Sequence, residues 1–419
     1  MPRTLSLPTI QNWSCHSCGN CCREHEIVVS EAEKQRILDQ NWTAADGVPE
    51  GMKAFERAAR GTDYAYRLAH RADGACVFLD QHNHCRIHAR FGEGAKPLGC
   101  RAFPFTFQPA GDGMIAVGVR FSCPSAAGNE GRPVADQRPD LQVLADMAVG
   151  QGDWPAPPIS PSQQLDWADT RRIIDRLREV LCAGEQPGLV MRLVRASFIE
   201  GMLGRATFDK VRGHRLDELL DTLIVAAPHE TVASAGDISA PTSLGKIQFR
   251  LVVAQYATRD TLAAGGLGYR LRKMLNGLRL TRGRGQTPPM QSALPSVPFS
   301  DLEGPFDASS TEIEQLFARY WQVKLMGLDF CGPACHGLTV IEGLQNLTLM
   351  FPVSLYVARW IARGQNRTFV SLQDAEAALA IVDHNYGRSA MMGRPNFRQR
   401  VRWLADHDEI VKLAAWYGR

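Results

Sequence analysis

The stretch Cys15-His-Ser-Cys18-Gly-Asn-Cys21-Cys22 decides how this chain is organised. Three cysteines follow one another with two intervening residues each, and a fourth stands directly after the third. This spacing lets a turn aim successive thiolates at one centre, and Gly19 relieves the backbone where the turn must bend. Adjacent side chains tend to project in different directions, so we expect Cys21 and Cys22 to face two centres, or one centre and a packing position. The stretch predicts a metal site.

The other cysteines are unevenly distributed along the chain. Eight of the 11 precede residue 125. Thiols gathered in one part of a long chain, without the basic and apolar start of a secretory signal, are more typical of metal ligands in the cytosol than of a disulfide scaffold. Buried thiols without a ligand are the alternative, but packing alone does not explain so many at chelating spacings. The predicted metal ligands are Cys15, Cys18, Cys21, Cys22, Cys76, Cys85, Cys100 and Cys123.

Four blocks in this region occur in the order found in a known family. Residues 15–22 are followed by Cys76-Val-Phe-Leu-Asp80, by Cys85-Arg-Ile-His88 and by Pro97-Leu-Gly-Cys-Arg-Ala-Phe-Pro104. Over about its first 125 residues the chain resembles the CxxCxxCC cysteine-cluster family (YkgJ-like), described as chelating zinc or iron. The chain departs from the family at residues 94–97, Gly-Ala-Lys-Pro, where an Arg-Pro pair is common. The resemblance implies a metal-binding domain.

The longer members of that family include the flagellin lysine N-methylases. Resemblance to them implies an iron-sulfur cluster, S-adenosylmethionine as cofactor and flagellin as a protein substrate. Beyond residue 125 this resemblance is carried by a helical second half and by the patterns Tyr320-Trp-Gln-Val-Lys-Leu325 and Asp383-His-Asn-Tyr-Gly387. The chain lacks the strand, glycine-rich loop and helix of a conventional nucleotide-binding sheet. We therefore assign no catalytic or cofactor-binding residue.

The cysteine pattern bears on the choice between iron-sulfur and zinc. Bacterial ferredoxins combine a Cys-x2-Cys-x2-Cys run with a further cysteine that precedes proline. Cys15, Cys18 and Cys21 together with Cys123-Pro124 have this pattern, which favours a 4Fe-4S cluster, and the other four cysteines would hold a second site or reinforce the first. Zinc needs only four convergent thiolates, so zinc sites are the alternative. Two alternatives to an enzyme stay open. In one, the metal is structural and the helical domain binds a partner; in the other, the protein is an electron carrier. Nearby histidines are weaker candidate ligands.

The rest of the chain predicts an α+β fold. Residues 1–125 alternate short strand-like runs with turns, residues 126–160 are rich in Pro and Gly, and residues 161–419 are mostly helical in pattern. We expect a small cysteine-rich metal-binding domain, a linker and a mainly α-helical domain with these boundaries.

Three local expectations follow from the pattern of caps and apolar residues. Ser30 and Glu33 form a capping box that opens a helix. Ser160, Pro161 and Gln163 predict that the first helix of the helical domain begins at Pro161. The apolar residues 338–362 contain Glu, Gln, Asn, Pro and Arg, so we expect a buried helix rather than a bilayer span.

Composition and net charge limit the classes of partner that the chain is expected to bind. Of 419 residues, 45% are hydrophobic and 22% are charged, and the formal net charge is +3, which is typical of a globular protein and does not indicate nucleic acid. Residues 270–284 carry six basic and no acidic residues. We interpret them as a solvated helix face, with nucleic acid, an acidic protein surface or a cofactor as alternatives. We expect a cytoplasmic protein with no membrane and no nucleic-acid partner.

Overall fold

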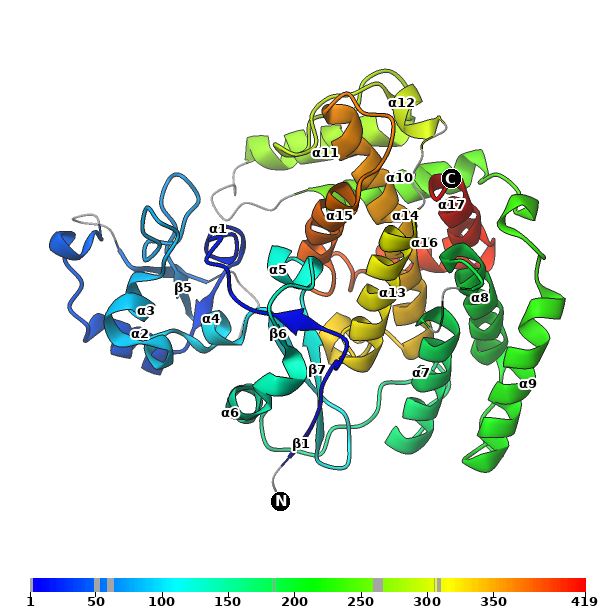
Figure 1. Cartoon of the computed structure of the whole chain (residues 1–419), viewed down its shortest axis with the longest axis horizontal. Helices are drawn as coiled ribbons and strands as arrows, with labels where there is room; N and C mark the ends of the chain where they lie inside the picture. The colour runs from blue at the N-terminus through cyan, green and yellow to red at the C-terminus, as the bar shows by residue number, and fades with distance from the viewer. Residues whose placement is uncertain are drawn as a thin grey trace.

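The computed structural model describes residues 3–48, 53–58, 64–182, 184, 186–258, 267–304, 306 and 310–419. Figure 1 shows a small part built around α1–α4 and β5 on one side, a sheet in the middle and the helices α7–α17 on the other side. The fold is α+β, as the sequence predicts, with its small sheets near the N-terminus and a mainly helical C-terminal part.

Two three-stranded sheets lie in the N-terminal third. The central sheet has the order β1 (Thr4–Ser6), β7 (Met114–Val119), β6 (Phe105–Pro109), with β1 parallel and β6 antiparallel to β7. In the other, β5 (Tyr66–Leu68) lies between β3 (Val28–Val29) and β4 (Phe55–Arg57) and is antiparallel to both.

A short antiparallel pair, β2 (Asn12–Trp13) and β8 (Arg132–Pro133), holds the chain just before the first cysteine.

The short helices of the N-terminal third are α1 (Cys21–Glu24), α2 (Glu31–Leu38), α3 (Arg86–Phe91), α4 (Leu98–Ala102), α5 (Pro124–Ala127) and α6 (Arg138–Ala148). The C-terminal part contains α7 (Trp167–Cys182), α8 (Leu189–Arg205), α9 (His214–Glu230), α10 (Ser243–Ala257), α11 (Leu267–Arg282), α12 (Phe299–Glu303), α13 (Thr311–Met326), α14 (Val340–Gly364), α15 (Leu372–Asn385), α16 (Pro395–Asp406) and α17 (Glu409–Tyr417).

The predicted capping box at α2 is confirmed. The Ser30 hydroxyl accepts the Glu33 backbone N–H, and the Glu33 carboxylate accepts the Ser30 backbone N–H. The second oxygen of the Glu33 carboxylate accepts the N–H of Leu98 at the start of α4, with a nitrogen–oxygen distance of 2.6 Å. One local motif therefore also fixes the helix that carries Cys100.

The predicted start of the first long helix at Pro161 is wrong. Ser160 and Gln163 instead pair as an isolated bridge, and the Gln163 side chain accepts the N–H of Phe208. Helix α7 begins six residues later, where the Asp166 carboxylate accepts the Asp169 N–H at 2.8 Å. An aspartate is as good an N-cap as a serine, so the helix can begin after Asp166, while the Gln163 side chain contacts Phe208 instead of closing a capping box.

The prediction of a buried apolar helix at residues 338–362 is confirmed. Helix α14 is long and apolar enough to cross a bilayer, but 94% of its most apolar window is buried inside the fold. It packs against α8, α10, α15, α16 and α17. It is the central helix of the C-terminal part.

The apolar side chains form two separate cores. The larger core joins β1, β6, β7 and α5 to the helices, from Leu5 to Tyr417. The smaller core lies among β3, α2, β5 and α3 and has ten buried members, among them Val29, Phe78 and Ile87. The second core surrounds several of the cysteines, so packing and metal ligation are linked there.

Candidate metal centre

The eight predicted cysteines line one cavity of about 850 Å³. Cys15 and Cys18 lie on the loop after β2, Cys21 and Cys22 open α1, and Cys100 lies in α4. The other three stand in the segment between β5 and α3 or just before a helix. These are Cys76, Cys85 and Cys123. All are free thiols.

The first cysteine loop bends as its spacing predicts. Ser17 and Gly19 both have positive φ, 54° and 74°. A Cβ atom on Gly19 would lie 2.9 Å from the side-chain oxygen of Asn83, which itself accepts a hydrogen bond from Arg23. Only glycine fits this left-handed position without displacing the neighbouring loop.

Cys21 and Cys22 do not project in different directions, and whether they serve one centre or two stays a prediction. Their sulfur atoms are 3.9 Å apart, because both side chains turn toward the cavity from the first turn of α1. The hydrogen bond with Cys22 and burial raise the pKa of Cys21. A tetrahedral ion with Zn–S bonds of about 2.3 Å has ligand sulfurs about 3.8 Å apart, so this pair has the separation that one zinc ion requires.

Further cysteines surround this pair on the inner side of the cavity. The backbone N–H of Cys76 donates to the carbonyl of Cys22 at 2.7 Å, which fixes the two segments together. Burial, with the nearby Cys85 and Cys21 thiolates, raises the pKa of Cys76 to about 12. Burial and the thiolates of Cys76, Cys85 and Cys21 raise the pKa of Cys100. The inner group is therefore Cys21, Cys22, Cys76, Cys85 and Cys100.

The outer group is more open. Cys15 and Cys18 are exposed, whereas Cys123 is buried as the residue before the first turn of α5. Burial raises the pKa of Cys18, with smaller contributions from the Cys21 and Cys15 thiolates. Burial also raises the pKa of Cys123, and the Cys18 thiolate adds to it. The structure thus brings together Cys15, Cys18 and Cys123, with Cys21 between the outer and inner groups.

The donor set fits a metal that prefers sulfur, although it is not closed as it stands. Within the described part of the chain, no three Cys, His, Asp or Glu side chains already converge on one point as ligands must. Thiols of both groups nevertheless line the same cavity. Softness of the donors selects zinc or iron-sulfur over magnesium or calcium.

The predicted linker supplies one wall of this cavity. Helix α6 places Asp140, Leu141, Val143 and Leu144 along it. Leu141 and Leu144 are buried and belong to the larger core. The boundaries at 125 and 160 stay a prediction, but residues 138–148 are part of the site.

Nearby histidines take other roles. The backbone N–H groups of His82 and His84 both donate to the Asp80 carboxylate, which forms a turn. The His16 ring lies 2.8 Å from the Glu130 carboxylate. His25 lines the cavity and is buried. Its ring is tilted against Phe103, with centroids 4.6 Å apart, and is stacked on His384 of α15, with centroids 4.9 Å apart. No local pattern in the sequence indicates this contact between the two halves.

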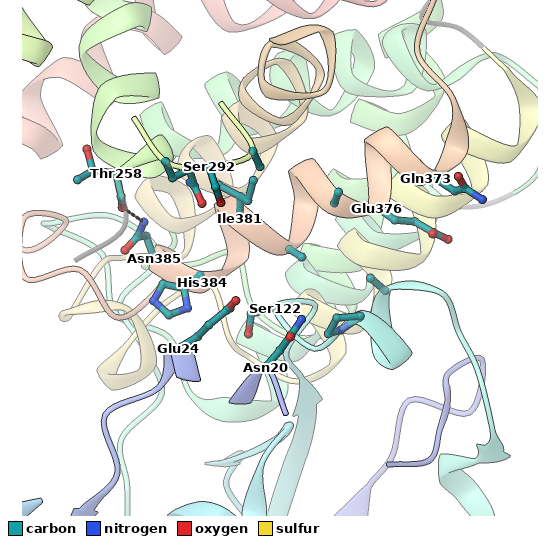
Figure 2. Close-up of a pocket in the computed structure, with 16 residues that line it drawn as sticks. Asn20, Glu24, Ser122, Thr258, Ser292, Gln373, Glu376, Ile381, His384 and Asn385 are labelled. Carbon is teal, nitrogen blue, oxygen red and sulfur yellow. Dashed lines mark hydrogen bonds between the residues drawn. The ribbon is translucent and has the colours of Figure 1, made fainter. Parts of the chain in front are cut away.

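His384 opens a second pocket, of about 410 Å³, between α1, α5, α15 and the segment at residues 291–293 (Figure 2). One face of α15 lines this pocket, with Glu376, Ala380 and His384 among the lining residues. Figure 2 shows Glu24 and Asn20 of the cysteine-rich part facing His384 across the pocket. Pro124 lines both this pocket and the cysteine cavity. The two spaces are neighbours.

The two patterns quoted from the helical half meet below this pocket. Lys324 of α13 and Asp383 of α15 form a buried ion pair with a nitrogen–oxygen distance of 2.8 Å, and the Tyr320 hydroxyl donates to the same carboxylate. Burial pushes the pKa of Asp383 upward, but Lys324 and Arg120 outweigh it and hold the pKa below its ordinary value. Both patterns are visible in the sequence, but nothing in the sequence shows that they are in contact.

This ion pair is connected to the cysteine cavity. The other oxygen of Asp383 accepts the N–H of Ser122, the residue before Cys123, at 3.1 Å. Arg120 donates to the backbone carbonyls of Asp383 and His384. The C-terminal end of α15 therefore holds the strand extension that leads into Cys123.

Comparison with known proteins assigns the cysteine-rich part. Residues 14–122 match the family model "CxxCxxCC: Putative zinc- or iron-chelating domain". No curated protein and no solved structure was found that matches the chain. The family match spans seven of the eight cavity cysteines and ends one residue before Cys123. The match supports a metal-binding cysteine-cluster domain in this part of the chain.

Proposed function

We propose, from the cysteine-cluster domain at residues 14–122, that the protein holds an iron-sulfur cluster in the cysteine cavity. The observation that carries the proposal is that eight free thiols, from segments spread over residues 15–123, line one cavity. Eight thiolates are enough for two centres, since a 4Fe-4S cluster and a zinc ion each take four.

The outer group supports a cluster in particular. Cys15, Cys18 and Cys21 have the spacing of ferredoxin ligands, and Cys123 with its following proline lies at the same cavity. Lys96, Arg101 and Arg132 also line the cavity. Their positive charge suits a cluster whose thiolate ligands bring negative charge. The inner group then holds a second centre or closes the first.

The 3.9 Å separation of the Cys21 and Cys22 sulfurs favours zinc as the competing metal. A zinc ion held by the inner group would be structural, a clamp that lets the small core fold and lets the helical part bind a partner.

The eleven cysteines are all free thiols, which supports a cytoplasmic location, where thiols stay reduced.

Metal analysis decides between these readings. Full-length protein purified without oxygen is assayed for iron, sulfide and zinc, and its visible absorption is recorded. A brown protein with about four iron and four sulfide per cluster is the expected result. A colourless protein with stoichiometric zinc would contradict the cluster and leave the structural clamp.

A second candidate function is transfer of a methyl group from S-adenosylmethionine to a protein lysine, with flagellin as substrate. The observation that favours it is the meeting of residues 320–325 and 383–387 at the Lys324–Asp383 ion pair. These are the segments by which the helical half resembles the flagellin lysine N-methylases. A pocket of about 410 Å³, large enough for a small cofactor or a side chain, lies directly beside them.

The chemistry requires a group that accepts a proton. The methyl carbon leaves the sulfonium and bonds to the lysine nitrogen, S-adenosylhomocysteine departs, and the ammonium loses one proton. Glu24, Glu376 and His384 are the titratable side chains that line the pocket. Burial raises the pKa of Glu376 and makes that carboxylate a better proton acceptor.

Two measurements test this function separately from the metal. Calorimetric titration of the metal-loaded protein with S-adenosylmethionine reports binding, and mass spectrometry of flagellin after incubation reports methylated lysine. Glu376→Gln should reduce methylation more than binding, and Glu230→Gln, an exposed carboxylate far along the chain, serves as control. A cluster-loaded protein that neither binds the cofactor nor methylates flagellin would refute methyl transfer while leaving the metal site intact.

A further inference from the structure

Helix α11 carries an apolar stripe on its outer face. Leu271, Met274, Leu275 and Leu278 are 48%, 56%, 51% and 52% exposed. Their spacing of three and four residues places them on one side of the helix. Leu280, half a turn away around the axis, is fully buried, and α11 packs against α10. The helix is therefore seated on the fold by one face while the opposite face presents large apolar side chains to solvent.

Scattered exposed apolar side chains are ordinary, but three leucines and a methionine in one continuous stripe are not. A contiguous apolar patch of this kind marks an interaction surface. Figure 1 shows α11 along the upper edge of the helical half, separate from the part that carries the cysteines. The stripe is therefore distinct from the metal cavity.

The charge around the stripe selects the partner. Residues 267–284 contain six basic residues and no acidic one. Arg279, Arg282 and Arg284 are exposed, and they make no ion pair with any other described residue. Counted at 100° per residue, Arg279 lies along one edge of the stripe and Arg282 at its C-terminal end. Leucines on the outward face with arginines at their border are the pattern of a helix that lies in a membrane interface.

We propose that α11 docks on the surface of an anionic lipid bilayer. The leucine stripe enters the boundary between headgroups and acyl chains, and the arginines at its border contact lipid phosphates. A second copy of the chain suits this face less well, because two copies would bring the arginines together. Nucleic acid would contact the arginines but leave the leucines in water. Surface docking differs from spanning, and it does not depend on which metal the cysteine cavity holds.

Vesicle flotation of the metal-loaded full-length protein tests the proposal. Vesicles of phosphatidylcholine with about one third phosphatidylserine supply the anionic surface, and pure phosphatidylcholine vesicles supply the neutral one. We expect the protein to float with the anionic vesicles, and the floated fraction to fall as salt is raised. Equal flotation with both vesicles, or none with either, would overturn the proposal.

Matched variants separate the two parts of the surface. The double variant Arg279→Glu, Arg282→Glu should weaken partitioning by about fivefold or more per position. Leu271→Ser with Leu278→Ser should abolish flotation at high salt. The controls are Arg215→Glu, an exposed arginine of α9, and Leu244→Ser, a leucine of α10 that is 49% exposed, and both should float like the wild type.

The same variants test the two other possible partners of the stripe, a second copy of the chain and nucleic acid. If the wild type sediments as a dimer that Leu271→Ser with Leu278→Ser dissociates, while vesicles are ignored, a second copy covers the stripe and the proposal is wrong. If polyanionic RNA displaces the protein from vesicles but the variant Leu271→Ser with Leu278→Ser still floats, the binding is purely electrostatic and the proposed docking geometry is wrong. Thermal unfolding of each variant checks that the fold is retained.

Discussion

Asp383 shows how one residue holds two parts of this molecule together. It is fully buried, it pairs with Lys324 and Tyr320 from α13, and it accepts the N–H that precedes Cys123. Its carboxylate is acceptable in the interior because two cations and two hydrogen-bond donors compensate for lost water. Removing either charge leaves the other buried and uncompensated.

Asp383→Asn should therefore lower the free energy of unfolding by about 3–5 kcal/mol, because it leaves the Lys324 ammonium without a counter-charge in the interior. Urea unfolding of the wild type, Asp383→Asn, Lys324→Met and the double variant measures the coupling. The double variant should recover much of the loss. Asp301→Asn, which breaks the partly exposed pair with Arg363, is the control and should cost about 1 kcal/mol or less. Equal losses at both sites would contradict a special role for the buried pair.

The thiols differ in their surroundings: four of the eleven are buried, five are partly exposed and two are exposed. Cys100 lines the cysteine cavity, whereas Cys182 ends α7 and does not line it. Burial raises the pKa of Cys182 to about 12, so it stays a thiol at neutral pH. Cys100→Ser should lower the bound metal substantially, and Cys182→Ser should leave it unchanged, as measured by metal content per chain. Full metal content in Cys100→Ser would remove this residue from the ligand set.

At the scale of elements, the helices of the C-terminal part meet around α14. Helix α8 places Glu200 against it, where the side chain hydrogen-bonds with Gln345. Burial, with a smaller contribution from Asp406, raises the pKa of Glu200 to about 8. The packing of these helices is therefore tied to the protonation of one carboxyl group.

This carboxyl group makes stability fall as pH rises. In the unfolded chain Glu200 loses its proton near the ordinary glutamate pKa of 4.5, whereas the folded protein keeps it up to about pH 8. The unfolded state is therefore favoured progressively between these values, and the loss levels off above them. Glu200→Gln removes this dependence, so the variant should be more stable than the wild type at pH 8 by on the order of 3–5 kcal/mol. Thermal unfolding at pH 5 and pH 8 measures it, and an equal gain at both pH values would argue against titration of Glu200.

At the scale of the whole molecule, the two apolar cores differ greatly in size. The smaller core has ten buried members and shares Cys76 with the metal cavity, whereas the larger one extends through all the long helices, reaching α11 at Leu280. A core this small gives limited stability without cross-links, and metal ligation supplies free energy of folding in such domains. The metal should therefore stabilise one part of the chain selectively.

Metal removal is expected to unfold the cysteine-rich part alone. After chelation under reducing conditions, amide hydrogen exchange should become fast across residues 21–100 and stay slow in α13, α14 and α15. The ion pair at Asp383 remains in the metal-free protein, so the helices keep their packing. Exchange that is unchanged at residues 21–100 would mean that the small core folds without the metal.

Much of this organisation could be predicted from the sequence. The cysteine spacing predicted a metal domain, the apolar pattern predicted the buried helix α14, and the Ser30–Glu33 capping box predicted the start of α2. These features are local: each depends on residues a few positions apart, whose geometry the backbone itself restricts. The α+β order of the chain followed from the same kind of evidence.

Only the tertiary structure decided how distant segments meet. It paired Lys324 with Asp383, stacked His25 on His384, turned Cys21 and Cys22 to the same side, and moved the start of α7 from Pro161 to Trp167. Each outcome depends on side chains that lie tens to hundreds of positions apart or on a choice between equally good local caps. The sequence by itself determined which chemistry each segment carries, and the folded core determined which segments share a site, because packing of the whole chain selects among contacts that local patterns leave equally favourable.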